Sequence, residues 1–170
     1  DEAFLLNTRV VENLARWLGM NSAVKLIHIS TDQVYSGNNG PHLEKDACPL
    51  NVYGITKYCG ELAAMQANGT VLRTNYFGTG SSARPSLSDW FINEFKRGSE
   101  IKLFTDIQFS PLHVDTLVEV VDLVLVRPVP GVFNLGSCDG MTKRDFGIEL
   151  ASYLGLDSSH AIDATSQAMQ

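Results

Sequence analysis

Tyr53 and Lys57 stand four residues apart in the stretch YGITK, a spacing that puts two side chains on one face of a helix. An isolated phenol ionises at a pKa of about 10, and a nearby ammonium group favours the phenolate and lowers that pKa. Such a tyrosine can give a proton to a carbonyl oxygen or take one from an alcohol. The same spacing also arises by chance, so the neighbouring segments must show whether the two residues take part in a reaction.

A hydroxyl group precedes this pair at the end of a predicted strand. Residues 24–30, VKLIHIS, form a short apolar run with β-branched members, which is typical of a strand buried on both faces. The run leads into STDQVY, which contains Thr31. Ligands of open parallel sheets bind at the carboxyl ends of the strands. We therefore expect Thr31 to face a crevice and to hold a reacting oxygen for Tyr53.

Helices and strands alternate along the part of the chain that must position these residues. The apolar patterns predict helices over 3–18, 52–66, 87–98, 115–126 and 142–156, and strands over 24–30, 70–77, 100–104 and 131–137. Asp115 and Thr142 are predicted helix caps. The last dozen residues are small and polar, and we expect them to fray. The alternation over the first 80 residues indicates a parallel α/β architecture.

The composition narrows the class of protein. A net charge of −6 and a pI near 5.1 argue against a nucleic-acid partner. No apolar run is long enough for a membrane span and no signal peptide is visible, so we expect a cytoplasmic protein. We expect Cys48, Cys59 and Cys138 to be reduced, packed thiols, and His28 to be a core residue with its hydrogen bonds satisfied. No metal site is therefore expected.

Three blocks, STDQVYSG, PLNVYGITKYCGE and VLRTNYFG, resemble the extended short-chain dehydrogenase/reductase family. Within it, the likeness is to the dTDP-4-dehydrorhamnose reductase branch of sugar-nucleotide reductases. The resemblance implies an α/β fold, with a partial Rossmann-like parallel sheet and part of a small carboxyl-terminal substrate lobe. Residues 1–80 would form the carboxyl half of the NAD(P)-binding domain, and residues 81–170 the substrate-lobe segments and a returning strand and helix.

The resemblance also implies a role for single residues. Thr31, Tyr53 and Lys57 match the catalytic set, in which the lysine also grips the nicotinamide ribose of NADPH or NADH. The residues that match cofactor contacts are Asn7, Ser30, Tyr53, Lys57 and Asn75. The residues that match contacts to a nucleotide-linked keto-sugar are Asp32, Gln33, Val34 and Tyr76. The helices over 3–18 and 52–66 match the family's dimer bundle, so a homodimer is expected.

Several departures from the family pattern bear on binding. Many relatives carry an arginine for the diphosphate near Phe109 or Ser110; Arg84 or Lys102 could substitute for it. The glycine-rich strand–turn–helix that opens family members does not precede residue 1, so we expect a fragment or a natural truncation. Residues 1–170 alone should then bind cofactor weakly, and an open sheet edge should favour association. GTGSSA, residues 78–83, formally matches a dinucleotide fingerprint, but a substrate-side loop is the better interpretation.

Three alternatives stay open. A sugar-nucleotide epimerase or dehydratase uses the same tyrosine in the reverse direction, although the triplet STD favours the reductase. A non-catalytic subunit that keeps the fold and regulates a partner enzyme is a rival of another class. The pair Tyr53 and Lys57 could also be an ordinary surface pair, with Thr31 merely ending a strand.

Overall fold

A computed structural model describes residues 2–21, 23–37, 40–81 and 83–166. The contacts divide the chain into two compact units. The first consists of Asp1–Asn75 with Asp115–Gly136, and the second of Tyr76–Val114 with Ser137–Gln170. Within the described residues, no helix is long and apolar enough to span a membrane.

The first unit carries the parallel sheet. Its elements in chain order are α1 (Glu2–Phe4), the π-helix η1 (Leu5–Arg9), α2 (Val10–Leu18), β1 (Ile27–Thr31), the 3₁₀ helices η2 (Asp32–Val34) and η3 (Glu44–Asp46), α3 (Val52–Gln66), β2 (Thr70–Phe77), α5 (Val114–Val126) and β6 (Gly131–Leu135).

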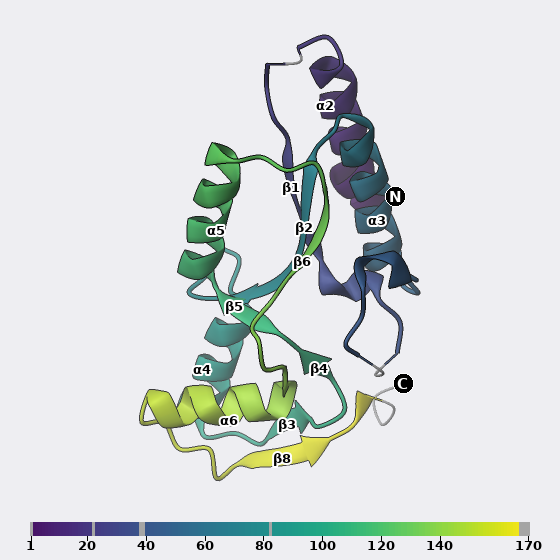
Figure 1. Ribbon diagram of the computed structural model, residues 1–170. Coiled ribbons are helices and arrows are strands. Elements are labelled where there is room, and N and C mark those ends of the chain that lie inside the picture. Colours follow the sequence, from purple (N-terminus) through teal and green to yellow (C-terminus); the bar gives the residue numbers. More distant parts are fainter. Residues whose placement is uncertain (1, 22, 38–39, 82, 167–170) are drawn as a thin grey trace. The chain divides into compact units, whose positions relative to one another are not determined.

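β2 is the middle strand and pairs in parallel with β1 on one side and β6 on the other, so that Leu72 stands level with Ile29 and Phe133. α2 and α3 lie on one side of these strands, and α5 lies on the other (Figure 1). Val71 and Leu72, which point to opposite faces of β2, are both buried, at 0% and 3% exposure. β2 is therefore covered on both faces at these two positions. The strand predicted as buried on both faces is β1, where Ile27, His28 and Ile29 are partly buried and Ser30 and Thr31 are buried.

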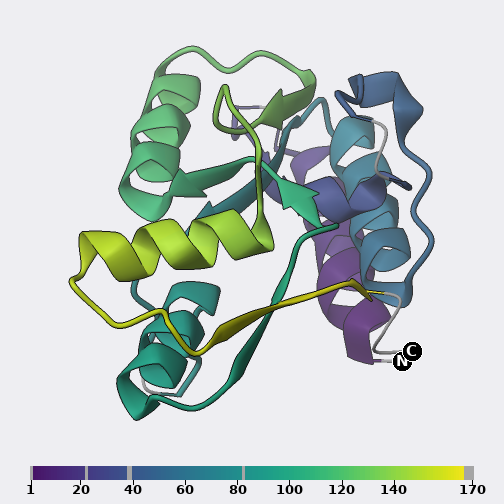
Figure 2. The ribbon, with the colours of Figure 1, turned by 90° about the horizontal axis from the view of Figure 1, so that it is seen from below.

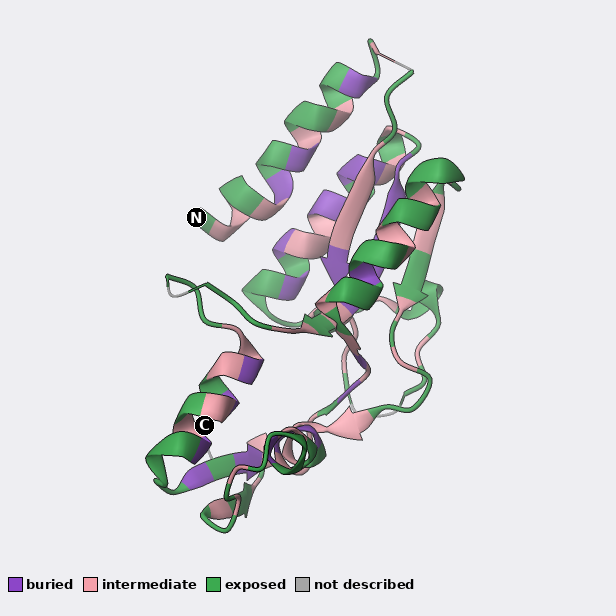
Figure 3. Ribbon diagram, turned by 90° about the vertical axis from the view of Figure 1, so that its left-hand side faces the viewer, coloured by how far each residue is buried: buried purple, intermediate pink, exposed green. Residues whose placement is uncertain are grey.

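Close packing holds α3 against the amino-terminal helices. Val11 of α2, Ala63 and Ala64 of α3 and Val71 of β2 form one buried cluster. A Cβ atom at Gly60 would collide with the carbonyl oxygen of Asn7, so only glycine allows this approach. Figure 3 shows buried residues on α3 and β2, whereas α5 is exposed along most of its length.

Most predicted bounds hold in this unit, but β1 begins three residues later than the predicted strand 24–30 and β6 ends two residues before the predicted end at 137. The helix predicted over 3–18 is present as α1, η1 and α2, and α3 and β2 begin and end where the sequence predicts. One cap is wrong. α5 begins at Val114, directly after β5, so Asp115 lies in its first turn instead of capping it.

The second unit is built around phenylalanine side chains. Its elements are α4 (Leu87–Arg97), β3 (Ile101–Phe104), β4 (Gln108–Phe109), β5 (Pro111–His113), β7 (Met141–Thr142), α6 (Lys143–Tyr153) and β8 (Ala161–Ala164). The buried core consists of Phe91, Phe95, Ile101, Leu103, Phe109, Phe146 and Ala151. Figures 1 and 2 show α4 and α6 as neighbours in this unit.

The carboxyl-terminal end corrects one prediction and confirms another. Residues 161–164 do not fray; they form β8, which pairs in parallel with β3. The other prediction, the cap of α6, is confirmed, because Thr142 Oγ1 accepts a hydrogen bond of 3.0 Å from the N–H of Asp145. The tail beyond residue 166 lies outside the described residues.

The thiols are free but not all packed. Cys48 and Cys138 are exposed and Cys59 is partly buried. The sequence therefore predicted the packing of Cys48 and Cys138 wrongly, because both lie outside the regular elements that bury side chains. No cluster of potential metal ligands is found in the described part of the chain.

Candidate active site

The turn after β1 brings three predicted site residues together. Thr31 caps the short helix η2, and its Oγ1 accepts a hydrogen bond of 3.2 Å from the N–H of Gln33. The same hydroxyl donates to Asp32 Oδ1 at 3.3 Å. Asp32 also accepts two bonds, of 3.0 and 3.2 Å, from Asn75 Nδ2. Thr31 is thus held in a fixed orientation at the carboxyl end of a parallel strand.

α3 presents the tyrosine–lysine pair. Asn51 caps this helix by accepting a hydrogen bond of 2.7 Å from the N–H of Gly54. Tyr53, in the first turn, is 45% exposed. Lys57 lies one turn later and half-buried, and its Nζ donates to the carbonyl oxygen of Ile29 at 2.6 Å. The spacing puts Tyr53 and Lys57 on one face of α3.

The start of α3 packs closely on the turn that carries Thr31. A Cβ atom at Gly54 would stand 2.5 Å from the carbonyl oxygen of Gln33, nearer than packed atoms approach. Glycine at this position therefore lets the helix that bears Tyr53 lie against the turn. Together with the bond from Lys57 to β1, this contact fixes α3 to the end of the strand.

Two opposing effects act on the pKa of Lys57. Burial disfavours the ammonium form and lowers the pKa of Lys57, while the negative charge of Glu61 opposes this shift. The bond to Ile29 uses one of the three hydrogens of the ammonium group. Two donors are left for a ligand, because no other bond from Lys57 is found within the described residues.

Asn7 is connected to α3 rather than isolated on a helix face. Its Nδ2 donates to Thr56 Oγ1 at 3.0 Å, and Thr8 Oγ1 donates to the Thr56 carbonyl oxygen at 2.8 Å. Thr56 Oγ1 in turn donates to the carbonyl oxygen of Tyr53 at 3.0 Å. Asn7 lies in the π-helix η1, a kind of irregularity that is frequent at functional sites.

Four further predicted residues are Ser30, Gln33, Val34 and Tyr76. Ser30 is buried on the side of β1 that faces α3, and its hydroxyl donates to Glu61. Val34 is fully buried, at 0% exposure, whereas its neighbour Gln33 is exposed. Tyr76 is 55% exposed and belongs to the second unit. Their roles as ligand contacts stay predictions.

The segment GTGSSA is tied to the helix that follows it. Asp89 Oδ2 accepts hydrogen bonds from the N–H groups of Gly80, at 2.7 Å, and Ser86, at 2.8 Å. These bonds lower the pKa of Asp89. A carboxylate of the chain already occupies the N–H group of Gly80 that a phosphate would need, which favours the loop interpretation over the fingerprint.

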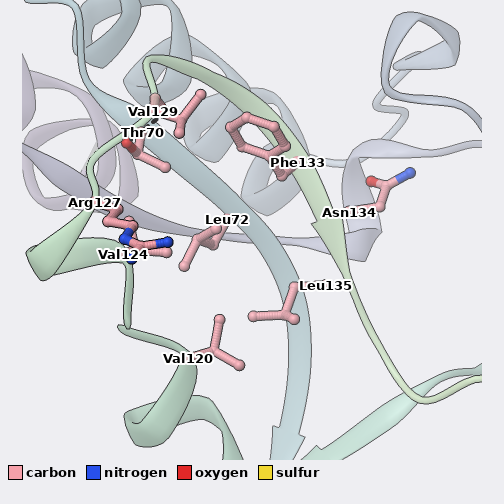
Figure 4. A pocket seen from close by; sticks show the side chains of 9 residues that line it. All are labelled: Thr70, Leu72, Val120, Val124, Arg127, Val129, Phe133, Asn134 and Leu135. Atoms are coloured by element: carbon pink, nitrogen blue, oxygen red, sulfur yellow. Dashed lines mark hydrogen bonds between the residues drawn. The ribbon is translucent and has the colours of Figure 1, made fainter. Parts of the chain in front are cut away.

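Two pockets of the first unit lie away from these residues. One, of about 270 Å³, is lined by Thr70, Leu72, Val120, Val124, Arg127, Val129, Phe133, Asn134 and Leu135 (Figure 4). The other, of about 450 Å³, is lined by Glu12, Ala15, Arg16 and Gln66. Neither contains Thr31, Tyr53 or Lys57.

Two features of the site escape sequence reasoning. His28 Nε2 is buried without a hydrogen-bond partner in the described structure, so the prediction of a satisfied histidine is wrong. Arg73 and Glu61 form a buried ion pair of 2.6 Å behind the site. In the sequence, the only sign of this ion pair is that Arg73, a charged residue, lies within the predicted buried strand, and this does not identify Glu61 as its partner.

Comparisons with known proteins agree with this architecture. Residues 1–170 match the family described as RmlD substrate binding domain. The chain is 30% identical to the methionine adenosyltransferase 2 subunit beta of Rattus norvegicus over 181 residues, which cover 94% of this chain and 51% of that protein. It is 32% identical to the dTDP-4-dehydrorhamnose reductase of Escherichia coli over 155 residues, which cover 85% of this chain and 50% of that protein.

A solved structure gives the same fold. The dTDP-4-dehydrorhamnose reductase of Bacillus anthracis, in complex with NADP, superposes with a TM-score of 0.82 at 21% identity, over 96% of this chain and 58% of that one. The chain spans about half the length of the curated relatives it matches. With residues 1–170 matched throughout, the chain belongs to the RmlD substrate-binding domain family.

Proposed function

We propose that the whole protein reduces a keto group of a nucleotide-linked sugar, using NADPH or NADH, and that this chain supplies its proton donor. One observation carries the proposal. The helix with Tyr53 and Lys57 is packed by Gly54 against the turn that orients Thr31, at the carboxyl end of a parallel strand. The likeness to a dTDP-4-dehydrorhamnose reductase supports a deoxysugar linked to dTDP as the substrate.

The residues fit a reduced nicotinamide cofactor. Lys57 keeps two N–H donors for a ribose hydroxyl, and Asn75 lies beside the turn that holds Thr31. When bound, the cofactor supplies a hydride, with its electron pair, to the keto carbon. Because the phenol of Tyr53 is half-exposed, it can reach the sugar oxygen.

The chain's own residues then complete the reduction. To hold the keto oxygen, the Thr31 hydroxyl turns its single hydrogen from Asp32 to that oxygen. Tyr53 donates its proton to the same oxygen as negative charge develops there. The O–H bond of Tyr53 breaks and that of the alcohol product forms. The ammonium group of Lys57 stabilises the phenolate that remains. Asn7, through Thr56, holds the first turn of α3 in place.

A test compares the wild-type protein with Tyr53→Phe and Lys57→Ala in the reduction of a dTDP-linked 4-keto-6-deoxysugar. Loss of a general acid typically costs about 10²–10⁴-fold in rate. We expect Tyr53→Phe to lose that much in kcat with little change in KM for the cofactor, and Lys57→Ala to lose cofactor binding as well. Lys96→Ala, at an exposed lysine of α4, is the matched control. Unchanged turnover in Tyr53→Phe refutes the proposal.

Location and assembly follow from the same proposal. Nucleotide sugars and reduced nicotinamide cofactors point to the cytoplasm and to polysaccharide synthesis. Apolar side chains on the outer faces of the amino-terminal helices and α3 are exposed, which supports the homodimer through the helices 3–18 and 52–66. The residues concerned are Leu5, Leu6, Val10, Leu14, Trp17, Val52, Ile55 and Leu62.

A second candidate is a subunit that binds a partner enzyme. The methionine adenosyltransferase 2 subunit beta, which matches over 94% of this chain, favours it. If the whole protein shows no turnover of any nucleotide-linked keto-sugar and yet forms a stable complex with a separate enzyme, this candidate replaces the reductase.

A further inference from the structure

A buried arginine lies behind the candidate site and contacts both segments that border it. Arg73, on β2, is 4% exposed, and Glu61, on α3, is 1% exposed. Arg73 Nη2 donates to Glu61 Oε2 at 2.6 Å, and Nε lies 3.0 and 3.1 Å from the two carboxylate oxygens. Glu61 follows Lys57 by one helical turn, so these hydrogen bonds connect Arg73 directly to α3, the helix that carries Tyr53 and Lys57.

The remaining nitrogen of the guanidinium group reaches a different segment. Arg73 Nη1 donates to the hydroxyl of Tyr35 at 2.8 Å and to the carbonyl oxygen of Glu44 at 2.7 Å. The guanidinium carbon also stands 5.2 Å from the centre of the Tyr35 ring. Tyr35 and Glu44 belong to the loop that follows η2, the turn with the predicted sugar contacts.

Strand β6 also contacts this loop, through Asn134. Asn134 Oδ1 accepts from the hydroxyl of Tyr35 at 2.5 Å, and Asn134 Nδ2 donates to the carbonyl oxygen of His42 at 3.0 Å. The backbone N–H of Asn134 donates to Glu44 Oε1 at 3.0 Å. The rings of Tyr35 and His42 stack at 4.9 Å. The loop is therefore fastened to the sheet at several points rather than solvated throughout.

A buried ion pair is weak support for stability, because apolar side chains of similar volume often stabilise a core as well or better. What an apolar residue could not do is bind Glu61, Tyr35 and the Glu44 carbonyl at once. The directional bonds of Arg73 are thus better explained by positioning than by stability.

We infer that Arg73 is a positioning residue that couples the helix carrying Tyr53 and Lys57 to the loop segments 35–37 and 40–46, and so sets the sugar side of the site. The assignment to a sugar site rests on the proposed function, whereas the coupling itself does not. Glu61 and Tyr35 are the two arms of this coupling, which we call the Arg73 clamp.

Amide hydrogen exchange of the unliganded chain tests the clamp without any substrate. The N–H of Asp46 bonds to the Leu43 carbonyl oxygen, and the N–H of Cys48 bonds to the Val34 carbonyl oxygen. Tyr35→Phe removes only the hydroxyl between Arg73 and Asn134. We expect exchange at both amides to become about tenfold faster, as the loss of one hydrogen bond implies. Exchange within α3 should not change.

Tyr58→Phe is the matched control, because the Tyr58 ring also lies against Arg73, at 5.9 Å, and its hydroxyl makes no hydrogen bond within the described residues. It should leave the loop amides unchanged. Arg73→Lys keeps the charge opposite Glu61 but cannot reach all three partners, so it should accelerate exchange in the loop and in α3 together. If Arg73→Lys does not fold, the two tyrosine variants still decide.

Two results would overturn the clamp: unchanged loop exchange in Tyr35→Phe, or equal acceleration in Tyr35→Phe and Tyr58→Phe. In the whole protein, Tyr35→Phe should raise KM for the nucleotide-linked sugar about tenfold and leave kcat within about twofold. Faster loop exchange in Tyr35→Phe, together with no reductase activity in the wild-type protein, would refute the proposed function and still support the clamp.

Discussion

His28 should make the protein lose stability as the pH falls from neutral toward 5. Burial, helped by the positive charge of Lys57, lowers the pKa of His28 from 6.5 to about 4. In the unfolded chain the histidine binds a proton near its ordinary pKa, while in the folded chain it stays neutral until about pH 4. Between these values the unfolded state binds more protons, so the free energy of unfolding falls as the pH falls.

The size of this loss follows from the two pKa values. At about 1.4 kcal/mol per pH unit, the gap between 6.5 and about 4 sets a ceiling of about 3 kcal/mol, reached only below about pH 4. At about pH 5 the expected loss is about 2 kcal/mol, and the residual exposure of His28 lowers it somewhat.

Urea unfolding at about pH 7.5 and at about pH 5 measures the effect. The variant His28→Leu cannot titrate and also removes the buried unpartnered nitrogen, so it should lose about 2 kcal/mol less than the wild type over this interval. His160→Gln, at an exposed histidine, is the control and should behave as the wild type. If the free energy of unfolding depends on pH equally in the wild type and in His28→Leu, His28 is not the buried, neutral histidine described above.

Three further predictions concern the scaffold. Glu61→Ala leaves the charge of Arg73 buried without its partner, so the free energy of unfolding measured in urea should fall by about 3–5 kcal/mol. A fall of less than about 1 kcal/mol would contradict the buried ion pair. Thr142→Ala removes the cap of α6 and should cost about 1 kcal/mol, while Thr142→Ser should restore most of it. Leu6→Glu charges the exposed apolar stripe of the first helix and should halve the molar mass measured by light scattering, whereas an unchanged mass would locate any dimer elsewhere.

The regular elements near the candidate site were predictable because their signals are local. The β-branched and aromatic residues of TVLRTNYF give the bounds of β2, and Asn51 before Val52 and the NG at residues 68–69 give those of α3. β8 was missed because a four-residue strand is stabilised by a distant partner, β3. Its residues carry no local pattern that distinguishes them from a frayed tail.

The site was predicted by spacing and resemblance, but the directions of its side chains were not. Successive residues of a strand alternate between faces, so Ser30 turns toward Glu61 while Thr31 caps the turn. The sequence does not say which face α3 covers, so it could not show that the hydroxyl of Ser30 turns toward α3. Arg73 and Glu61 are 12 positions apart and on different elements, a contact that only the fold creates.

The most direct test of the account measures proton donation by Tyr53 in the whole protein. With a saturating dTDP-linked 4-keto-6-deoxysugar, the oxidation of NADPH should be fast in the wild type and in Lys96→Ala. It should fall by about 10²–10⁴-fold in Tyr53→Phe, with cofactor affinity retained. Turnover by Tyr53→Phe at the wild-type rate would contradict the central claim that the phenol on α3 is the acid of a reductase.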